Sequence, residues 1–89
     1  MATATTSKAM VADVYTKLTT ASTGYALIYN PSDSGQTLRI YNGASAPAIT
    51  VDTYMTLEPD QAFQRTSDIT DDLYGWFADN TTKKVVITE

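Results

Sequence analysis

The hydrophobic residues of this chain recur at every second position over short stretches, and polar turns separate these stretches. Such alternation is typical of a β-strand with one face toward a core, whereas a helix of eleven or more residues repeats its apolar positions about every 3.6 residues. Gln36–Asn42 is the clearest strand, because Leu38 and Ile40 point inward while Thr37, Arg39 and Tyr41 point outward. The pattern therefore predicts a chain of short strands.

Further strands are expected where β-branched and aromatic residues lie between Gly, Pro, Asn or Asp residues. They are Val11–Leu18, Gly24–Asn30, Ala48–Val51, Thr53–Leu57, Ala62–Thr66, Leu73–Ala78 and Lys83–Thr88. The first of these also fits a short helical turn, and the two that flank Asp52 also fit one bent strand. Gly24–Asn30 is apolar on both faces, with Tyr25, Leu27 and Tyr29 on one of them, so we expect it to be central or covered on both sides.

Two turns define the second half of the predicted fold. Glu58–Gln61 has Pro59 at the first corner position, which its fixed φ favours. Asp79–Asn80 is expected to join the last two strands in a closing β-hairpin that contains the only tryptophan, Trp76. The sequence therefore predicts an all-β fold, a small antiparallel β-sandwich or a jelly-roll-like barrel of about seven to eight short strands.

The first ten residues differ from the rest, because they are rich in Ala, Thr and Ser and lack a face that a core would bury. We expect residues 1–10 to form an N-terminal arm and residues 11–89 to form a single β domain. No apolar core with a cleavage site follows Met1, so we expect no signal peptide. A neighbouring subunit is the natural candidate to hold such an arm.

Composition narrows the function classes. The 89 residues carry a net charge of -4 with only six scattered basic residues, which argues against nucleic acid as a partner. The chain contains no cysteine and no histidine, so it lacks the thiolate metal ligands, the disulfides and the commonest general base. No apolar run approaches the length that spans a membrane. We therefore expect neither a nucleic-acid-binding protein nor a membrane protein.

Carboxylates are the only candidate metal ligands or catalytic groups. The candidate metal site is the acidic cluster Asp68, Asp71 and Asp72, which Asp79 could join. It lacks the alternating acidic positions and the glycine of a calcium loop, so solvated charges are the favoured interpretation. Asp52, Glu58 and Asp60 offer pairs of carboxylates, but catalysis by such pairs needs a desolvated cleft that a domain of this size has little volume to form. We therefore expect no metal, no cofactor and no enzymatic activity.

The aromatic residues allow two interpretations. Tyrosine and tryptophan side chains on an exposed sheet can stack on sugars, so a carbohydrate-binding module is one hypothesis. A chain this short also needs large residues to fill its core, which favours a buried position for Trp76 or Phe77, whichever faces inward. Tyrosine is enriched at protein interfaces, and we assign Tyr41 to that role.

Four stretches resemble small β-rich proteins from the virion gene clusters of tailed bacteriophages. Leu38–Gly43 (LRIYNG) and Val85–Glu89 (VVITE) match strands of that family. Leu57–Gln61 (LEPDQ) is similar to its Leu-x-Pro-Gly-x turn, although Asp60 replaces the usual glycine, and Leu73–Ala78 (LYGWFA) is similar to its Leu-Tyr-Ala-Ile strand. The resemblance covers the chain from about Gln36 onward.

The resemblance implies a non-enzymatic virion component, most often a capsid decoration (cement) protein. Such a protein is an oligomer that bridges neighbouring major capsid proteins, and it assembles onto the virion in the host cytoplasm. A tail, neck or fibre-attachment component is the alternative within the virion. The residues that we expect at the interface belong mainly to the N-terminal arm. They are Thr3, Thr5, Thr6, Lys8, Met10 and Tyr41.

Overall fold

The computed structural model describes residues 5–19, 26–65, 71–77 and 83–89. Within these ranges the chain forms eight strands and one single-turn 3-10 helix, η1 (Ser32–Ser34). The strands are β1 (Thr5–Ala9), β2 (Thr16–Lys17), β3 (Ala26–Asn30), β4 (Leu38–Gly43), β5 (Met55–Leu57), β6 (Gln61–Arg65), β7 (Asp72–Phe77) and β8 (Lys84–Thr88). No helix in the described ranges is long and apolar enough to cross a membrane.

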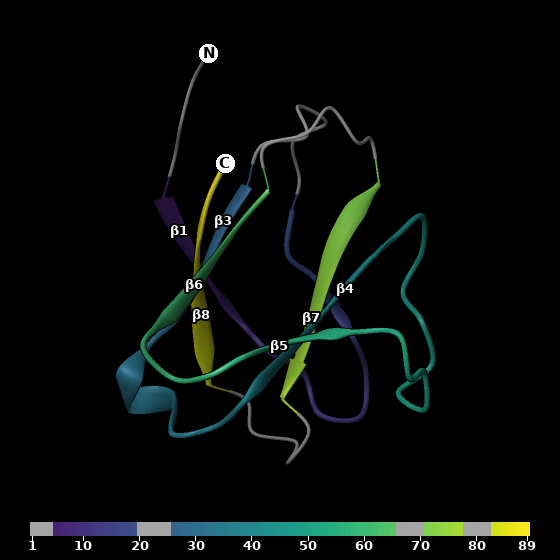
Figure 1. Cartoon of the computed structure of the whole chain (residues 1–89), viewed down its shortest axis with the longest axis horizontal. Coiled ribbons are helices and arrows are strands. Elements are labelled where there is room, and N and C mark those ends of the chain that lie inside the picture. The colour runs from purple at the N-terminus through teal and green to yellow at the C-terminus, as the bar shows by residue number, and fades with distance from the viewer. Residues whose placement is uncertain (1–4, 20–25, 66–70, 78–82) are drawn as a thin grey trace.

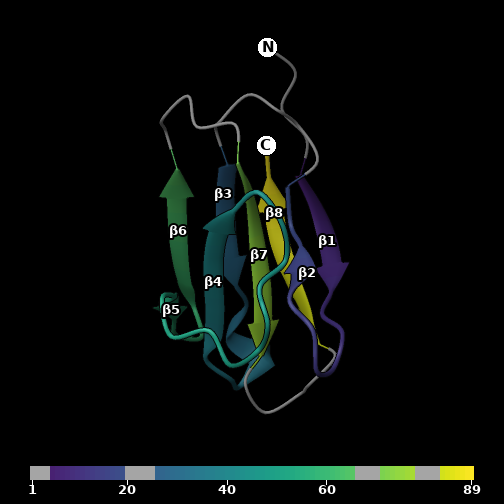
Figure 2. The same cartoon turned by 90° about the vertical axis from the view of Figure 1, so that its right-hand side faces the viewer.

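The strands form two four-stranded sheets that pack face to face (Figures 1 and 2). One sheet has the order β1-β8-β3-β6 and the other the order β2-β7-β4-β5, and every neighbouring pair is antiparallel. The predicted all-β class is therefore confirmed, and the two packed sheets make the fold a small sandwich. β1 and β6 are the opposite edges of the first sheet, while β2 and β5 are the edges of the second.

The main core lies between the sheets and contains side chains from both of them. Alternation of inward and outward residues places every second side chain of a strand in this core, as the pleat of a β-strand requires. Among the described residues, Phe77 is the largest side chain that is fully buried. The core residues are Met10, Leu18, Ala26, Ile28, Leu38, Ile40, Leu57, Leu73, Phe77, Val85 and Ile87.

Several predicted features agree with the structure. Leu38 and Ile40 face the core from β4, as their alternation predicted. β3 is a central strand that pairs with β6 on one side and β8 on the other. The predicted turn after Leu57 is present, with the Gln61 amide donating to the Glu58 carbonyl at 3.1 Å. Asp60 has φ of 68° in this turn, which is the left-handed conformation that glycine adopts most easily.

The predicted closing hairpin is wrong. β7 pairs with β2 and β4, whereas β8 pairs with β1 and β3, so the two strands belong to different sheets. Their inward residues, Phe77 on β7 and Val85 on β8, both belong to the core between the sheets. The apolar face of each strand fits a hairpin and a sandwich equally well, and packing across the core decides the outcome. The proposed turn at Asp79–Asn80 lies outside the described residues.

Two further strand predictions differ from the structure. Val11–Leu18 is mostly a turn, with Asp13 at φ of 63°, and only Thr16–Lys17 forms a strand. Ala48–Val51 is a turn closed by the Val51 amide, which donates to the Ala48 carbonyl at 3.0 Å. In β3 the side chains of Ala26, Ile28 and Asn30 are buried, while Leu27 and Tyr29 on the other face are half-buried.

The buried face of β3 ends in a polar residue because Asn30 finds a partner for each polar atom of its side chain. Its amide nitrogen donates to the Gln36 and Leu57 carbonyls at 2.8 Å each, and its amide oxygen accepts from the Ser34 hydroxyl at 2.7 Å. A buried polar side chain is stable only when it is hydrogen-bonded in this way. Asn30 thereby links β3 of one sheet to β5 of the other.

Residues 5–10 belong to the domain and do not form a separate arm. β1 pairs with β8 over five residues, from Thr5 opposite Thr88 to Ala9 opposite Lys84. The Met10 amide then donates to the Lys83 carbonyl at 3.1 Å, and the Met10 side chain is buried in the core. Composition alone concealed this strand, because its own residues are small and polar and its order comes from the partner strand β8.

We expect Phe77→Ala to lower the free energy of unfolding by about 3–5 kcal/mol, because it removes a fully buried aromatic side chain and leaves a cavity. Urea denaturation followed by tryptophan fluorescence measures this loss. Val14→Ala is the matched control, because Val14 is 47% exposed and its truncation should change stability by no more than about 0.5 kcal/mol. Equal effects of the two substitutions would contradict the placement of Phe77 in the core.

Candidate functional site

The outer edge of β1 is the candidate functional site that the fold creates from the N-terminal residues. All five residues of β1 are exposed, although a strand in a sandwich normally buries one of its faces. The opposite sheet ends here in β2, which has only two residues. β1 uses one edge to pair with β8, and no described residue pairs with its other edge. Figure 2 places it at one side of the molecule.

Local contacts fix β1 in place without covering its outer edge. The Thr5 and Thr88 hydroxyls lie 2.9 Å apart across the pair with β8. After Met10, the Val11 amide donates to the Thr16 hydroxyl at 3.3 Å, which holds the turn that leads into β2. Lys8 is the only charged residue of the strand. An ordered edge with small side chains can pair with an extended segment of another chain through its backbone groups.

The predicted interface residues do not all lie together. Thr5, Thr6 and Lys8 are exposed on β1, as an interface requires. Met10 was assigned to the same interface, but its side chain is 1% exposed and packs in the core, so it cannot contact a partner. Tyr41 is half-buried on β4 of the other sheet. Thr3 lies outside the described residues.

The aromatic residues form a second cluster on the outer face of the sheet that contains β7. Trp76 is 6% exposed, and Tyr15 and Tyr41 pack near it, with the Tyr15 ring centroid 5.7 Å from Trp76 and 6.3 Å from Tyr41. Arg39 stacks over Tyr54 at 4.4 Å and over Trp76 at 5.5 Å. The expectation that Trp76 or Phe77 would be buried holds for both residues. Trp76 therefore has no open face on which a sugar could stack.

The Tyr15 hydroxyl is the weak point of this aromatic cluster. It is buried and has no hydrogen-bond partner among the described residues. Burial without a partner disfavours the phenolate, which raises the pKa of Tyr15 above its usual value. The Tyr15 ring contributes packing, but burying its hydroxyl costs desolvation free energy. A tyrosine in a binding site would instead use its hydroxyl to bind a ligand.

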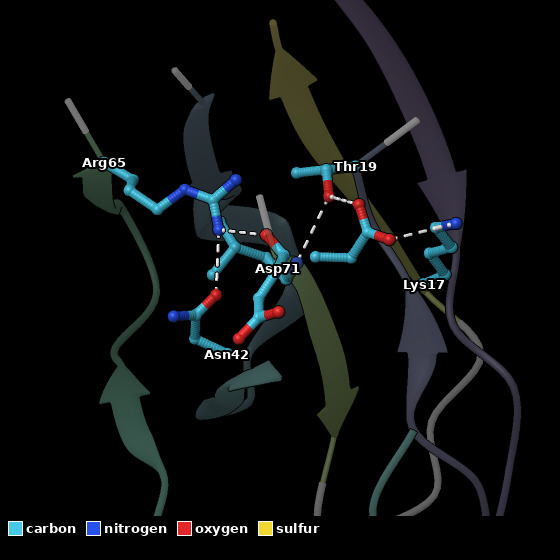
Figure 3. A network of polar contacts seen from close by, with 7 residues as sticks. Lys17, Thr19, Asn42, Arg65 and Asp71 are labelled. Atoms are coloured by element: carbon cyan, nitrogen blue, oxygen red, sulfur yellow. Dashed lines mark hydrogen bonds and ion pairs between the residues drawn. The ribbon is translucent and has the colours of Figure 1, made fainter. Parts of the chain in front are cut away.

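A polar network joins the two sheets at the start of β7 (Figure 3). Asp72 accepts from the Thr19 hydroxyl at 2.8 Å and forms an ion pair with Lys17 at 3.1 Å. The Thr19 hydroxyl also accepts from the Leu73 amide at 3.2 Å. Arg65 donates to the Asn42 side-chain oxygen at 2.8 Å and to the Asp71 carbonyl at 2.7 Å. Each of these side chains already serves the fold.

The acidic residues of the candidate cluster are thus used differently from metal ligands. The Thr19 hydrogen bond, and then Lys17, hold the pKa of Asp72 below its usual range. No group of three or more acidic residues in the described ranges could hold a metal ion. Glu58 instead accepts from the Thr37 hydroxyl, and Asp60 accepts from the Tyr29 hydroxyl at 2.5 Å. Asp68 lies outside the described residues.

A groove lies on the opposite side of the sandwich from β1, and it was not predicted from the sequence. It has a volume of about 510 Å³ and lies where β5 and β6 form the edges of the two sheets. Ile40, Phe63 and Leu73 line it with apolar surface, and Asn42 and Arg65 supply polar groups. The only sequence signal was Arg65, a basic residue in an otherwise uncharged strand.

No protein-family model, curated protein or solved structure matches this chain. The family resemblance of its four short stretches therefore stays a prediction.

We expect Asp72→Asn to lower stability at pH 7 by about 0.5–1 kcal/mol, because it removes the charge that Lys17 pairs with while keeping an oxygen for Thr19. The pKa of Asp72 is depressed in the fold, so its contribution is complete above the unfolded value of about 3.9 and is lost as the pH falls through the lower folded value. Denaturation at several pH values measures the difference.

The variant and the wild type should therefore converge in stability as the pH falls below the depressed folded-state pKa of Asp72. Asp33→Asn is the control, because the Asp33 side chain is exposed and the substitution removes the same charge. A difference between Asp72→Asn and the wild type that stays constant across this pH range would contradict the ionic role of Asp72.

Proposed function

We propose that this chain is a non-enzymatic structural protein of a tailed bacteriophage virion, and specifically a capsid decoration protein. It binds the outside of the head and bridges neighbouring major capsid proteins. The observation that carries the proposal is β1, a fixed strand with all five residues exposed and its outer edge open among the described residues. The resemblance of Leu38–Gly43, Leu57–Gln61, Leu73–Ala78 and Val85–Glu89 to virion proteins of this kind supplies the context.

The geometry supports binding by strand addition. An extended segment of a capsid protein that pairs with β1 adds a fifth strand to the sheet β1-β8-β3-β6. Backbone hydrogen bonds then supply the attraction, and the small side chains Thr5, Thr6 and Ser7 let the two strands approach. Lys8 discourages two free copies from pairing in solution, because like charges would come together. A bound copy strengthens the head by adding buried area at a seam between capsid subunits.

A tail, neck or fibre-attachment component is the alternative role within the virion, and it would use the same edge of β1. Copy number separates the two roles, because the head surface repeats many times and the neck or tail attachment repeats few times.

We expect quantitative mass spectrometry of purified particles to find this chain in about the copy number of the major capsid protein, on the order of hundreds per particle, since decoration follows the repeat of the shell. A dozen copies or fewer would assign the chain to the neck or tail instead. Absence of the chain from purified particles would contradict both roles.

We expect one of the two substitutions Thr6→Pro and Ser7→Pro to abolish particle binding without unfolding the domain. Neighbouring residues of a strand direct their N–H groups to opposite edges, so one proline removes a hydrogen bond to β8 and the other removes an outward N–H. Thermal denaturation identifies the variant that keeps its fold, and co-sedimentation with particles that lack the protein measures its binding.

Thr6→Ala and Ser7→Ala are the controls, since they keep both N–H groups and should bind like the wild type. Wild-type binding by the folded proline variant would show that β1 does not pair with the particle. Deletion of residues 1–10 is a poorer test, because it also removes the buried Met10 from the core.

A further inference from the structure

The groove between β5 and β6 exists because β5 is shorter than its partner. β4 runs from Leu38 to Gly43, but β5 pairs only with Leu38, Arg39 and Ile40. Residues 52–54, which precede β5, line the groove and do not pair with β4. The edge of β4 at residues 41–43 therefore has no partner strand among the described residues.

The shape and lining of the groove favour an extended peptide. Its volume of about 510 Å³ is in the range of protein binding pockets. The buried residues Ile40 and Leu73 and the half-buried Phe63 of β6 all line it. The edge of β4 at residues 41–43 presents backbone donors and acceptors with the spacing that an extended segment can pair with. A segment that pairs there directs every second side chain toward the core side, and one of these can fill the groove.

Met55 and Arg65 both line the groove but differ in polarity and in exposure. Met55 lines the groove and is 45% exposed, so it is one of the few large apolar side chains that the fold leaves in water. Arg65 is 7% exposed, and its hydrogen bonds to Asn42 and to the Asp71 carbonyl fix the polar end of the groove. The groove thus combines an adaptable apolar rim with a rigid polar end.

The exposed charge in the lining of the groove is acidic. Asp52 is exposed and lines the groove, whereas Arg65, the cation of the lining, is buried and donates to Asn42 and to the Asp71 carbonyl. A partner with a lysine or arginine residue beside its apolar residue complements Asp52, in keeping with the net charge of -4 of the whole chain.

We propose that this groove binds an extended, basic segment of another protein, which pairs with the open edge of β4 and inserts one large apolar side chain between Met55 and Phe63. The site is separate from β1, because β5 and β6 lie at the opposite side of the sandwich (Figure 2). It does not depend on the proposed virion role, since the groove can bind such a segment in any assembly.

A synthetic peptide tests this directly with the full-length protein. The probe is the capped peptide Lys-Thr-Lys-Phe-Lys-Thr-Lys, which alternates basic and neutral positions around one phenylalanine. Two matched peptides replace either phenylalanine by serine or all lysines by glutamate. We expect the first peptide to bind with a Kd below about 1 mM and to shift the NMR signals of the Met55 methyl group and of residues 41–43. The two matched peptides should bind at least about tenfold more weakly.

Variants of the protein locate the binding surface. Met55→Ser should weaken binding about fivefold by removing apolar contact, whereas Val14→Ser, which changes an equally exposed side chain away from the groove, should not. Asp52→Lys should weaken binding about threefold or more, whereas Asp33→Lys changes the net charge equally at another exposed site and should have little effect. Both target residues are exposed, so these substitutions leave the core intact.

Four results would overturn the proposal. The first is the absence of saturable binding at about 1 mM peptide. The second is equal binding of the glutamate peptide, because the acidic groove would then not distinguish a basic peptide from an acidic one. The third is a concentration-dependent shift of the Met55 methyl signal in the protein alone, because the occupant of the groove would then be a second copy of this chain. Shifts confined to β1 would also exclude the groove as the binding site.

Discussion

The burial of β7 on both faces is the constraint on which the rest of this structure depends. Leu73 and Phe77 fill the core between the sheets, while Tyr74 and Trp76 are buried on the outer face. Cover for that outer face comes from the turn that contains Tyr15 and from the long connection between β4 and β5. A chain of this size buries only about 60% of its unfolded surface. Because segments of the chain are used to cover both faces of β7, other strands remain exposed.

Alternation in the sequence identified the strands that have one buried face and failed where tertiary contacts decide. β4 was predictable because Leu38 and Ile40 alternate with more exposed residues. The pairing of β7 was not predictable. Its five consecutive residues 73–77 are all buried, so they show no alternation that would assign the strand to one sheet. Asn30 was unpredictable for a related reason, since its burial depends on the Gln36 and Leu57 carbonyls, which the fold brings together.

The candidate sites follow from strands that end early. β2 has two residues and leaves β1 without cover, and β5 has three residues and leaves part of β4 without a partner. The sequence indicated the first site through its exposed Thr and Lys residues, but it missed that they form a strand and that Met10 anchors them to the core. Apart from Arg65 in an otherwise uncharged strand, it gave no sign of the groove, because residues from four strands line the groove and the topology brings them together.

Amide hydrogen exchange of the free and the particle-bound protein tests most directly the central claim that β1 is the edge through which this protein works. We expect the amides of residues 74–75 in β7 and 86–88 in β8 to exchange slowly in both states, because these residues pair with a strand on each side. Every second amide of β1 should exchange quickly in the free protein and become protected on the particle. Outward β1 amides that exchange equally fast in both states would contradict the account.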